Sequence, residues 1–346
     1  MSLLAIRKYF WHLRELGSSN LLRTLAFFKP WLCRQHLRGD GSRLSVCIDA
    51  RVGFFAQMNW VLAILAHCEE RGLRPHIELT GPFYAEVSGE NWLERFFTLD
   101  ADRNTQLHLM SEERHKCRIS DLEQLGLPGH YLREMSLQHA HALWQRYMHL
   151  DQEIAAHVEL FAVQHFTGRC VLGVHYRGTD KGSEAPPVSR EDCVGCVIRY
   201  LDAHPSIDLV FLSSDEAGFI DWFKQLVARV EIVVHDDQAR SYDGRAVHTH
   251  SVPGNVNPRG REALVNCLLL ARCNALIRTA SFLSAWSSVF NPALPVVMLN
   301  RPYSNKLWFP DSEIVRVAGH CPKNTAPSHF DDPKCDRQND FAIKDG

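Results

Sequence analysis

Residues 171–184 read Val-Leu-Gly-Val-His-Tyr-Arg-Gly-Thr-Asp-Lys-Gly-Ser-Glu, and this stretch decides the fold. Its first four residues are apolar with β-branched side chains, a pattern typical of a strand buried in a parallel sheet. The apolar run then stops, and five residues with basic or acidic side chains follow: His175, Arg177, Asp180, Lys181 and Glu184. Ligands of open α/β sheets bind outside the carboxyl ends of the strands, so this cluster is a candidate site.

The side chains of this cluster suit a charged substrate. Arg177 and Lys181 carry the positive charge that neutralises a diphosphate, and an arginine fork binds phosphate oxygens bidentately. Asp180 and Glu184 supply carboxylates for a proton-transfer step. The alternative is a strand end covered by a surface salt-bridge network. We favour the site, because three kinds of functional group meet at one edge.

Strands alternate with helices on both sides of this stretch. Strands are expected at 44–49, 75–79, 209–212, 230–234 and 275–278, and helices at 188–201, 219–228 and 261–273, with a further helix beginning near 279. Such alternation predicts an α/β fold whose parallel strands are joined by right-handed crossovers. The first strand, its loop and the following helix form the opening unit of a nucleotide-type domain.

Two further strand ends should open on the same edge of the sheet as Arg177. Asp215 and Glu216 follow one strand, and Thr279, Ser281 and Phe282 follow another at the start of a helix. The N–H groups and the dipole of a helix N-terminus bind anions. The alternative for the Ser/Thr loop is a simple helix cap without a ligand, and we expect both roles.

The domain boundary is expected just after a long helix. Residues 131–166 have helical apolar spacing and are rich in histidine, but no two of these histidines stand four apart, so they predict no metal pair. The predicted organisation is an N-terminal α/β domain at 1–168, a C-terminal Rossmann-like domain at 169–320 and a polar tail at 321–346.

Composition limits the partners and the location. The chain has 346 residues and a formal net charge of -2, which argues against nucleic acid. Eleven scattered cysteines, most of them inside apolar runs, indicate reduced buried thiols and a cytoplasmic location. Residues 1–38 are basic with interleaved Leu, Phe and Trp. They predict an amphipathic helix packed on the domain or, alternatively, a peripheral contact with an acidic inner-membrane surface.

The segment His-Tyr-Arg-Gly-Thr-Asp-Lys resembles the His-x-Arg-x-x-Asp-Lys segment of the α-1,6-fucosyltransferase family, which includes the nodulation and the N-glycan core fucosyltransferases. The segments 211–216 and 261–284 resemble the same family in the same order. The resemblance implies a GT-B fold, two Rossmann-like domains facing across a cleft. It also implies inverting, metal-independent transfer of fucose from GDP-fucose to a glycan hydroxyl. The alternatives are a non-catalytic nucleotide- or sugar-binding module and a transferase that uses another GDP-sugar.

By this resemblance Glu184 is the catalytic base and Lys181 orients phosphate or sugar, but the spacing between them is one residue shorter here, so Asp180 stays an alternative base. The implied donor-binding residues are His175, Arg177, Asp215, Glu216, Asn266, Thr279, Ser281 and Phe282. Two positions depart from the family pattern: Gly178 replaces a second arginine, and Asn266 replaces the aspartate that reads the base. In GT-B transferases a loop like that of Gly53 and Gln57 faces the acceptor, although a plain turn explains it equally well.

Overall fold

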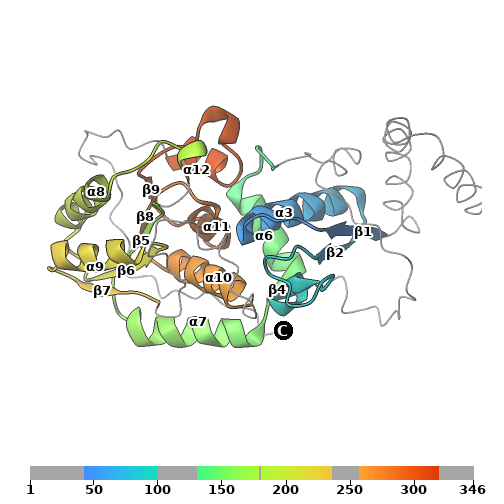
Figure 1. Cartoon of the computed structure of the whole chain (residues 1–346), viewed down its shortest axis with the longest axis horizontal. Coiled ribbons are helices and arrows are strands. Elements are labelled where there is room, and N and C mark those ends of the chain that lie inside the picture. The colour runs from blue at the N-terminus through green and yellow to red at the C-terminus, as the bar shows by residue number, and fades with distance from the viewer. Residues whose placement is uncertain (1–42, 100–130, 179–180, 236–256, 319–346) are drawn as a thin grey trace, which may run out of the picture.

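The computed structural model describes residues 43–99, 131–178, 181–235 and 257–318 (Figure 1). The strands are β1 (Arg43–Ile48), β2 (Arg74–Leu79), β3 (Phe97–Leu99), β4 (Met148–Leu150), β5 (Val171–Tyr176), β6 (Leu209–Ser214), β7 (Glu231–Val233), β8 (Ala275–Arg278) and β9 (Val296–Met298). The α-helices are α3 (Phe54–Arg71), α6 (Leu137–Tyr147), α7 (Gln152–His165), α8 (Arg190–Ala203), α9 (Ala217–Leu226), α10 (Asn257–Ala271), α11 (Phe282–Phe290) and α12 (Asp311–Ala318). Short 3-10 turns lie at Trp92–Arg95, Lys181–Ser183 and Ser304–Lys306.

Five parallel strands form the larger sheet, in the order β7-β6-β5-β8-β9. The first strand of this sheet along the chain is the central strand β5, and the next two, β6 and β7, lie successively further toward one edge. The chain then crosses back to β8, on the other side of β5, and continues to β9. The strand order therefore reverses between β5 and β8, which makes the carboxyl ends of these two strands the topological switch point of the sheet.

Helices cover both faces of this sheet, as Figure 1 shows. The face with Leu172 and Val174 packs against α8 and α9, in one hydrophobic cluster. The opposite face carries α10 and α11, and Gly173 gives α10 room to approach: a Cβ atom there would lie 3.2 Å from Cδ2 of Leu270. Every residue of β5 is buried, as its apolar sequence predicts for a central strand.

A smaller unit precedes this sheet along the chain. Strands β1 and β2 pair in parallel, and α3 connects them along the chain, so the expected strand-helix-strand opening is present. Its aromatic residues form a tight cluster around Phe54, whose ring centroid lies 5.1 Å from that of Trp92 and 5.5 Å from that of Tyr84. Trp92 is therefore a core residue.

The single long helix predicted over 131–166 is wrong. The chain forms α6, a short strand β4 and then α7, because β4 pairs antiparallel with β3. Met148 is extended and ends α6, and the side chain of Asp151 caps α7 by accepting hydrogen bonds from the N–H groups of Glu153 and Ile154. The helical spacing of the apolar residues continues through the break, so the spacing alone does not reveal it.

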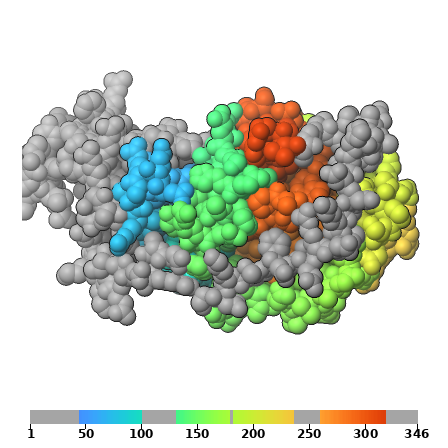
Figure 2. Space-filling view, turned by 180° about the vertical axis from the view of Figure 1, so that it is seen from behind, coloured from blue at the N-terminus to red at the C-terminus, as the bar shows by residue number. Residues whose placement is uncertain are grey.

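The two units share one hydrophobic core. Asn59 of α3 is fully buried between them: its Nδ2 donates to the carbonyl of Phe309 at 2.8 Å, and its Oδ1 accepts from Nε1 of Trp286 at 2.8 Å. Trp144 of α6 contacts Phe290 of α11, with ring centroids 4.9 Å apart. Figure 2 shows the green segment that begins at residue 131 lying between the blue and the orange elements.

The cysteines agree only partly with the expectation of reduced thiols. Cys68, Cys193, Cys267 and Cys273 are buried thiols, and burial raises the pKa of Cys68 to about 11. Cys170, however, is disulfide-bonded, so the expectation is wrong for this residue. Because disulfides persist mainly in oxidising compartments, cysteine usage supports a cytoplasmic location less than expected. The basic segment 1–38 lies outside the described residues, and none of the described helices could cross a membrane.

Candidate functional site

Two of the predicted site residues meet at the switch point between β5 and β8. Arg177 follows β5, and its backbone N–H donates to Oγ1 of Thr279 at 2.9 Å. In return, the N–H of Thr279 donates to the carbonyl of His175 at 3.0 Å. These two bonds extend the pairing of the strands beyond their ends and fix the position of Arg177. Its side chain is 19% exposed, so part of it reaches solvent at this edge.

The acidic pair after β6 lies beside Arg177. Oδ2 of Asp215 is 3.8 Å from Nε of Arg177, which is a long ion-pair distance. Glu216 accepts from Nε and Nη2 of Arg190 at 3.1 and 2.7 Å. It also fills the space beside Gly178, where a Cβ atom would lie 2.0 Å from Oε1 of Glu216. Gly178, which stands where the resemblance expects a second arginine, thus leaves room for the carboxylate of Glu216.

The loop after β8 leads into the N-terminus of α11. Ser281 is the N-cap residue, but its side chain makes no capping hydrogen bond. The simple-cap alternative is therefore wrong for the Ser281 side chain, and the first N–H groups of the helix have no intrahelical partner. Asn300 supports this loop, since its Oδ1 accepts from the N–H of Ala280 at 2.7 Å and its Nδ2 donates to the carbonyl of Pro186 at 2.7 Å.

A buried ion pair beneath this loop was missed by the sequence analysis. Arg278, the last residue of β8, is fully buried and pairs with Asp311 of α12. Its Nη2 donates to the carbonyl of Ser281 at 2.8 Å, and its Nε donates to Oγ of Ser284 at 2.9 Å. Arg278 thereby ties the first turn of α11 to the end of the sheet. An arginine closing an otherwise apolar strand at the site edge was the available signal.

Three buried polar groups gather on the face of the sheet under α10. Nδ1 of His175, Oγ of Ser213 and Oδ1 of Asn266 have no hydrogen-bond partner among the described residues. Ser213 is paired with His175 in the strand register. Leu270 of α10 packs on Gly173 of β5. Asn266 lies one helical turn before Leu270, about 6 Å along α10, and His175 lies two residues after Gly173, about 6.6 Å along β5. Asn266 therefore lies over His175. Unpaired buried polar groups are costly, which points to a polar ligand or water here.

The electrostatics keep His175 neutral. Burial, together with the charges of Arg278 and Arg177, lowers the pKa of His175 to about 3. Its ring therefore offers one donor and one acceptor at neutral pH. The Nδ2 atom of Asn266 donates to the carbonyl of Glu262 at 2.9 Å, so its Oδ1 is the atom left to accept from a ligand.

Glu184 lies on the α11 side of the same edge. Its carbonyl accepts from the N–H of Tyr303 at 2.9 Å, and its carboxylate adds to burial in raising the pKa of Tyr131. Tyr131 contacts Phe282, with ring centroids 5.2 Å apart, so Phe282 is part of an aromatic cluster near Glu184. Asp180 lies outside the described residues, as does the side chain of Lys181.

The loop of the first unit approaches this edge from the other side. Nε2 of Gln57 donates to the carbonyl of Val52 at 3.1 Å, while Oε1 of Gln57 is buried and has no partner in the described part of the chain. The Tyr84 hydroxyl is hydrogen-bonded to the backbone of Phe54 at the start of α3. That Gly53 and Gln57 face an acceptor stays a prediction.

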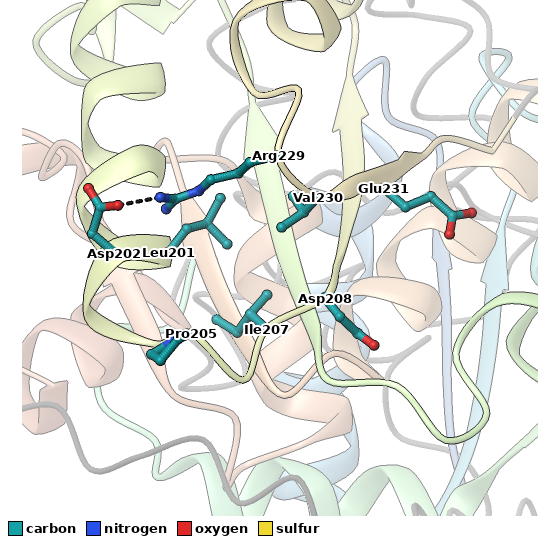
Figure 3. Close-up of a pocket in the computed structure, with 8 residues that line it drawn as sticks. All are labelled: Leu201, Asp202, Pro205, Ile207, Asp208, Arg229, Val230 and Glu231. Atoms are coloured by element: carbon teal, nitrogen blue, oxygen red, sulfur yellow. Dashed lines mark hydrogen bonds and ion pairs between the residues drawn. The ribbon is translucent and has the colours of Figure 1, made fainter.

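A cavity of about 600 Å³ lies at the opposite edge of the sheet. It is lined by Leu201, Asp202, Pro205, Ile207, Asp208, Arg229, Val230 and Glu231, close to the amino ends of β6 and β7 (Figure 3). Figure 3 shows the Arg229–Asp202 ion pair across one side of it. Ligands of parallel sheets bind at the carboxyl ends, so this groove is not the candidate site.

Among the described residues no cluster of three or more His, Cys, Asp or Glu side chains forms a metal site. The sequence does contain one Asp-x-Asp, at Asp100 and Asp102, which lie outside the described residues. The metal independence implied by the resemblance therefore stays a prediction.

No protein-family model matches the chain. No curated protein sequence matches it either. Among solved structures, NodZ α-1,6-fucosyltransferase soaked with GDP-fucose matches with a TM-score of 0.50 and 20% identity, over 74% of this chain and 94% of that chain. Fucosyltransferase NodZ from Bradyrhizobium matches with a TM-score of 0.50 and 20% identity, over 74% and 95% of the two chains. The expected fold is confirmed: the chain has the GT-B type α/β fold of these fucosyltransferases.

Proposed function

We propose that the protein is a glycosyltransferase that moves fucose from GDP-fucose to a hydroxyl group of a glycan, with inversion and without a metal ion. The observation that carries this proposal is the pairing of Arg177 with Thr279 at the switch point, beside the uncapped N-terminus of α11. An α/β sheet binds its ligand at this place. The solved structure of the same fold that was soaked with GDP-fucose supports the choice of donor.

The leaving group of this reaction is a nucleoside diphosphate. Negative charge grows on its β-phosphate as the glycosidic bond breaks, and groups that are already in place stabilise this charge without reorganisation. The backbone of Arg177 is fixed by its hydrogen bond to Thr279, and Arg278 holds the first turn of α11 through the carbonyl of Ser281. In this proposal the Arg177 side chain and the first turn of α11 bind the phosphate, and they supply the stabilisation that a metal ion provides elsewhere.

We assign the base of the nucleotide to the buried polar groups under α10. Oδ1 of Asn266 is an acceptor, and the neutral ring of His175 offers one acceptor or one donor beside it. The edge of guanine presents N–H donors next to a carbonyl acceptor, so it satisfies these groups in a complementary way. An asparagine offers one acceptor oxygen where an aspartate offers two, and we expect weaker discrimination among bases than an aspartate gives.

The acceptor hydroxyl must lose a proton as it attacks from the far side of the sugar. Glu184 is the proposed base, because the resemblance assigns it this role and its carboxylate lies close enough to Tyr131, beside Phe282, to raise the pKa of the tyrosine. Asp180 is the alternative base, and the shorter spacing between Lys181 and Glu184 is the reason to test both.

A donor screen tests the proposal. The purified protein is incubated with GDP-fucose, other GDP-sugars and UDP-sugars, and release of the nucleoside diphosphate is measured with and without a mixture of glycan acceptors. We expect release from GDP-fucose that increases with acceptor. Turnover of another GDP-sugar alone would correct the donor, and GDP binding in calorimetry without turnover of any donor would establish the non-catalytic alternative.

A further inference from the structure

Two carboxylates lie close to Arg177, where the diphosphate is proposed to bind. Asp215 lies 3.8 Å from the guanidinium, and Glu216 occupies the space beside Gly178. Arg190 is committed to Glu216 by two hydrogen bonds and is 44% exposed on the α8 side. A diphosphate placed against Arg177 would be repelled by these carboxylates, and a further cation on the other side of the ligand would offset that repulsion.

Helix α10 brings such a cation to the edge. Leu270 lies against Gly173, and Asn266 lies over His175. The N-terminal end of α10 is therefore the end that lies at the carboxyl end of β5. Arg259 precedes Asn266 by seven residues, which is two helical turns or about 10 Å on the same face of the helix. That distance carries Arg259 past His175 to the level of Arg177 and beyond the strand end.

The first turn of α10 is fixed there by packing on the first unit. A Cβ atom at Gly260 would lie 2.7 Å from Cζ of Phe96 and 3.2 Å from Cδ1 of Tyr84, so the helix backbone touches both rings. Tyr84 is buried, and the charges of both Arg177 and Arg259 act on its hydroxyl, against the burial that raises its pKa to about 12. Two cationic residues from different elements therefore lie close enough to act on the same buried tyrosine.

We propose that Arg259 is a second phosphate-binding residue, which holds the diphosphate of the nucleotide from the side opposite to Arg177 and takes over the charge absent at Gly178. The inference rests on the proposed function, because it assigns a residue to the same donor site. It adds to the donor site a residue of α10, an element other than the loop after β5. The contact of α10 with Tyr84 and Phe96 then positions the Arg259 cation.

Calorimetry on three proteins tests this role. Arg259→Ala is compared with the unchanged chain and with Arg261→Ala, a matched control that removes the same charge from an exposed position of the same helix. Each protein is titrated with GDP and with guanosine. One charge-assisted hydrogen bond contributes about 1.5–3 kcal/mol, so Arg259→Ala should bind GDP roughly tenfold to a hundredfold more weakly and guanosine equally well. Arg261→Ala should bind both as the unchanged chain does.

The outcomes separate this inference from the proposed function. If the unchanged chain binds no GDP, the proposed donor site is wrong. If it binds GDP and Arg259→Ala binds GDP equally well, Arg259 does not contact the phosphates. An equal loss of affinity for GDP and guanosine would assign Arg259 a structural role, which also overturns the proposal. Thermal unfolding of each variant checks the fold, and Arg259→Gln serves the same comparison if the alanine variant is unstable.

Discussion

Replacing Asp311 by asparagine should destabilise the protein strongly, because it leaves a charge in the core without its counter-ion. Arg278 is fully buried and Asp311 is 5% exposed, so the guanidinium has no route to water. Removing one partner of a buried ion pair typically costs about 3–5 kcal/mol. An unfolding entropy of about 2.1 cal/mol/K per residue gives about 0.7 kcal/mol/K for 346 residues, so each kcal/mol lowers the melting temperature by roughly 1.4 °C and the expected fall is about 4–7 °C.

The double variant Arg278→Met with Asp311→Leu separates charge burial from packing. Replacing both ions by apolar groups of similar volume removes the uncompensated charge, so the double variant should be more stable than Asp311→Asn alone. It should nevertheless bind GDP more weakly, because the Arg278 contacts to the Ser281 carbonyl and to Oγ of Ser284 are lost and the first turn of α11 loosens.

Urea unfolding followed by tryptophan fluorescence measures the stabilities, and calorimetry with GDP measures the affinities. Two results would refute the reasoning. The first is an Asp311→Asn variant within about 1 kcal/mol of the unchanged chain, the size of an exposed ion pair. The second is a double variant whose destabilisation equals the sum of those of the single variants Arg278→Met and Asp311→Leu, since interacting residues should not be additive.

The remaining predictions concern the reaction and its pH dependence. Arg177→Ala should lower donor turnover more than about a hundredfold in a GDP-release assay while its melting temperature stays unchanged, because the residue lies at a strand end. EDTA should leave turnover intact, and activity that is lost in EDTA and restored by magnesium or manganese would contradict the metal-free proposal. Glu184→Gln should keep its GDP affinity in calorimetry but lose transfer by about 10²–10⁴-fold, and an active variant would pass the role of base to another carboxylate. Burial and the charge of Arg278 hold the pKa of His175 at about 3, below the ordinary 6.5, so between these values only the unfolded state takes up the proton. Stability should therefore fall by about 2 kcal/mol from pH 7 to pH 5 through this residue, and His175→Gln, unfolded in urea at both pH values, should lack that part of the loss.

The edge of the large sheet was predictable from sequence because it depends on short-range patterns. The apolar run 171–174 ends in charged residues, and the strands 209–214 and 275–278 end in polar ones. A parallel sheet brings such ends to one edge without further information. The meeting of Arg177 with Thr279 followed from that rule, whereas the hydrogen bond between them needed coordinates.

The features that the sequence did not reveal depend on distant partners. The break between α6 and α7 forms because Met148–Leu150 pairs with β3, about fifty residues earlier in the chain. The Arg278–Asp311 pair joins residues 33 positions apart. Arg259 reaches the site only because α10 runs back across the sheet at a given register. Apolar periodicity carries no information on such pairings, since it reports which face is buried and not what covers it.

The contacts of Asn59 have a consequence for chimeric proteins. Under the proposed function, exchanging the first unit is an obvious way to change the acceptor, and the predicted domain boundary near residue 168 offers a joint. A C-terminal half cut there would expose Trp286 and leave the Phe309 carbonyl without its side-chain donor. A graft must therefore bring an amide at the position of Asn59 and an aromatic ring at that of Phe55, which contacts Trp286 with ring centroids 5.6 Å apart. The two halves can be exchanged only if their contacting surfaces match each other. Recombination libraries should therefore place their crossover points so that α3 and α11 come from the same parent.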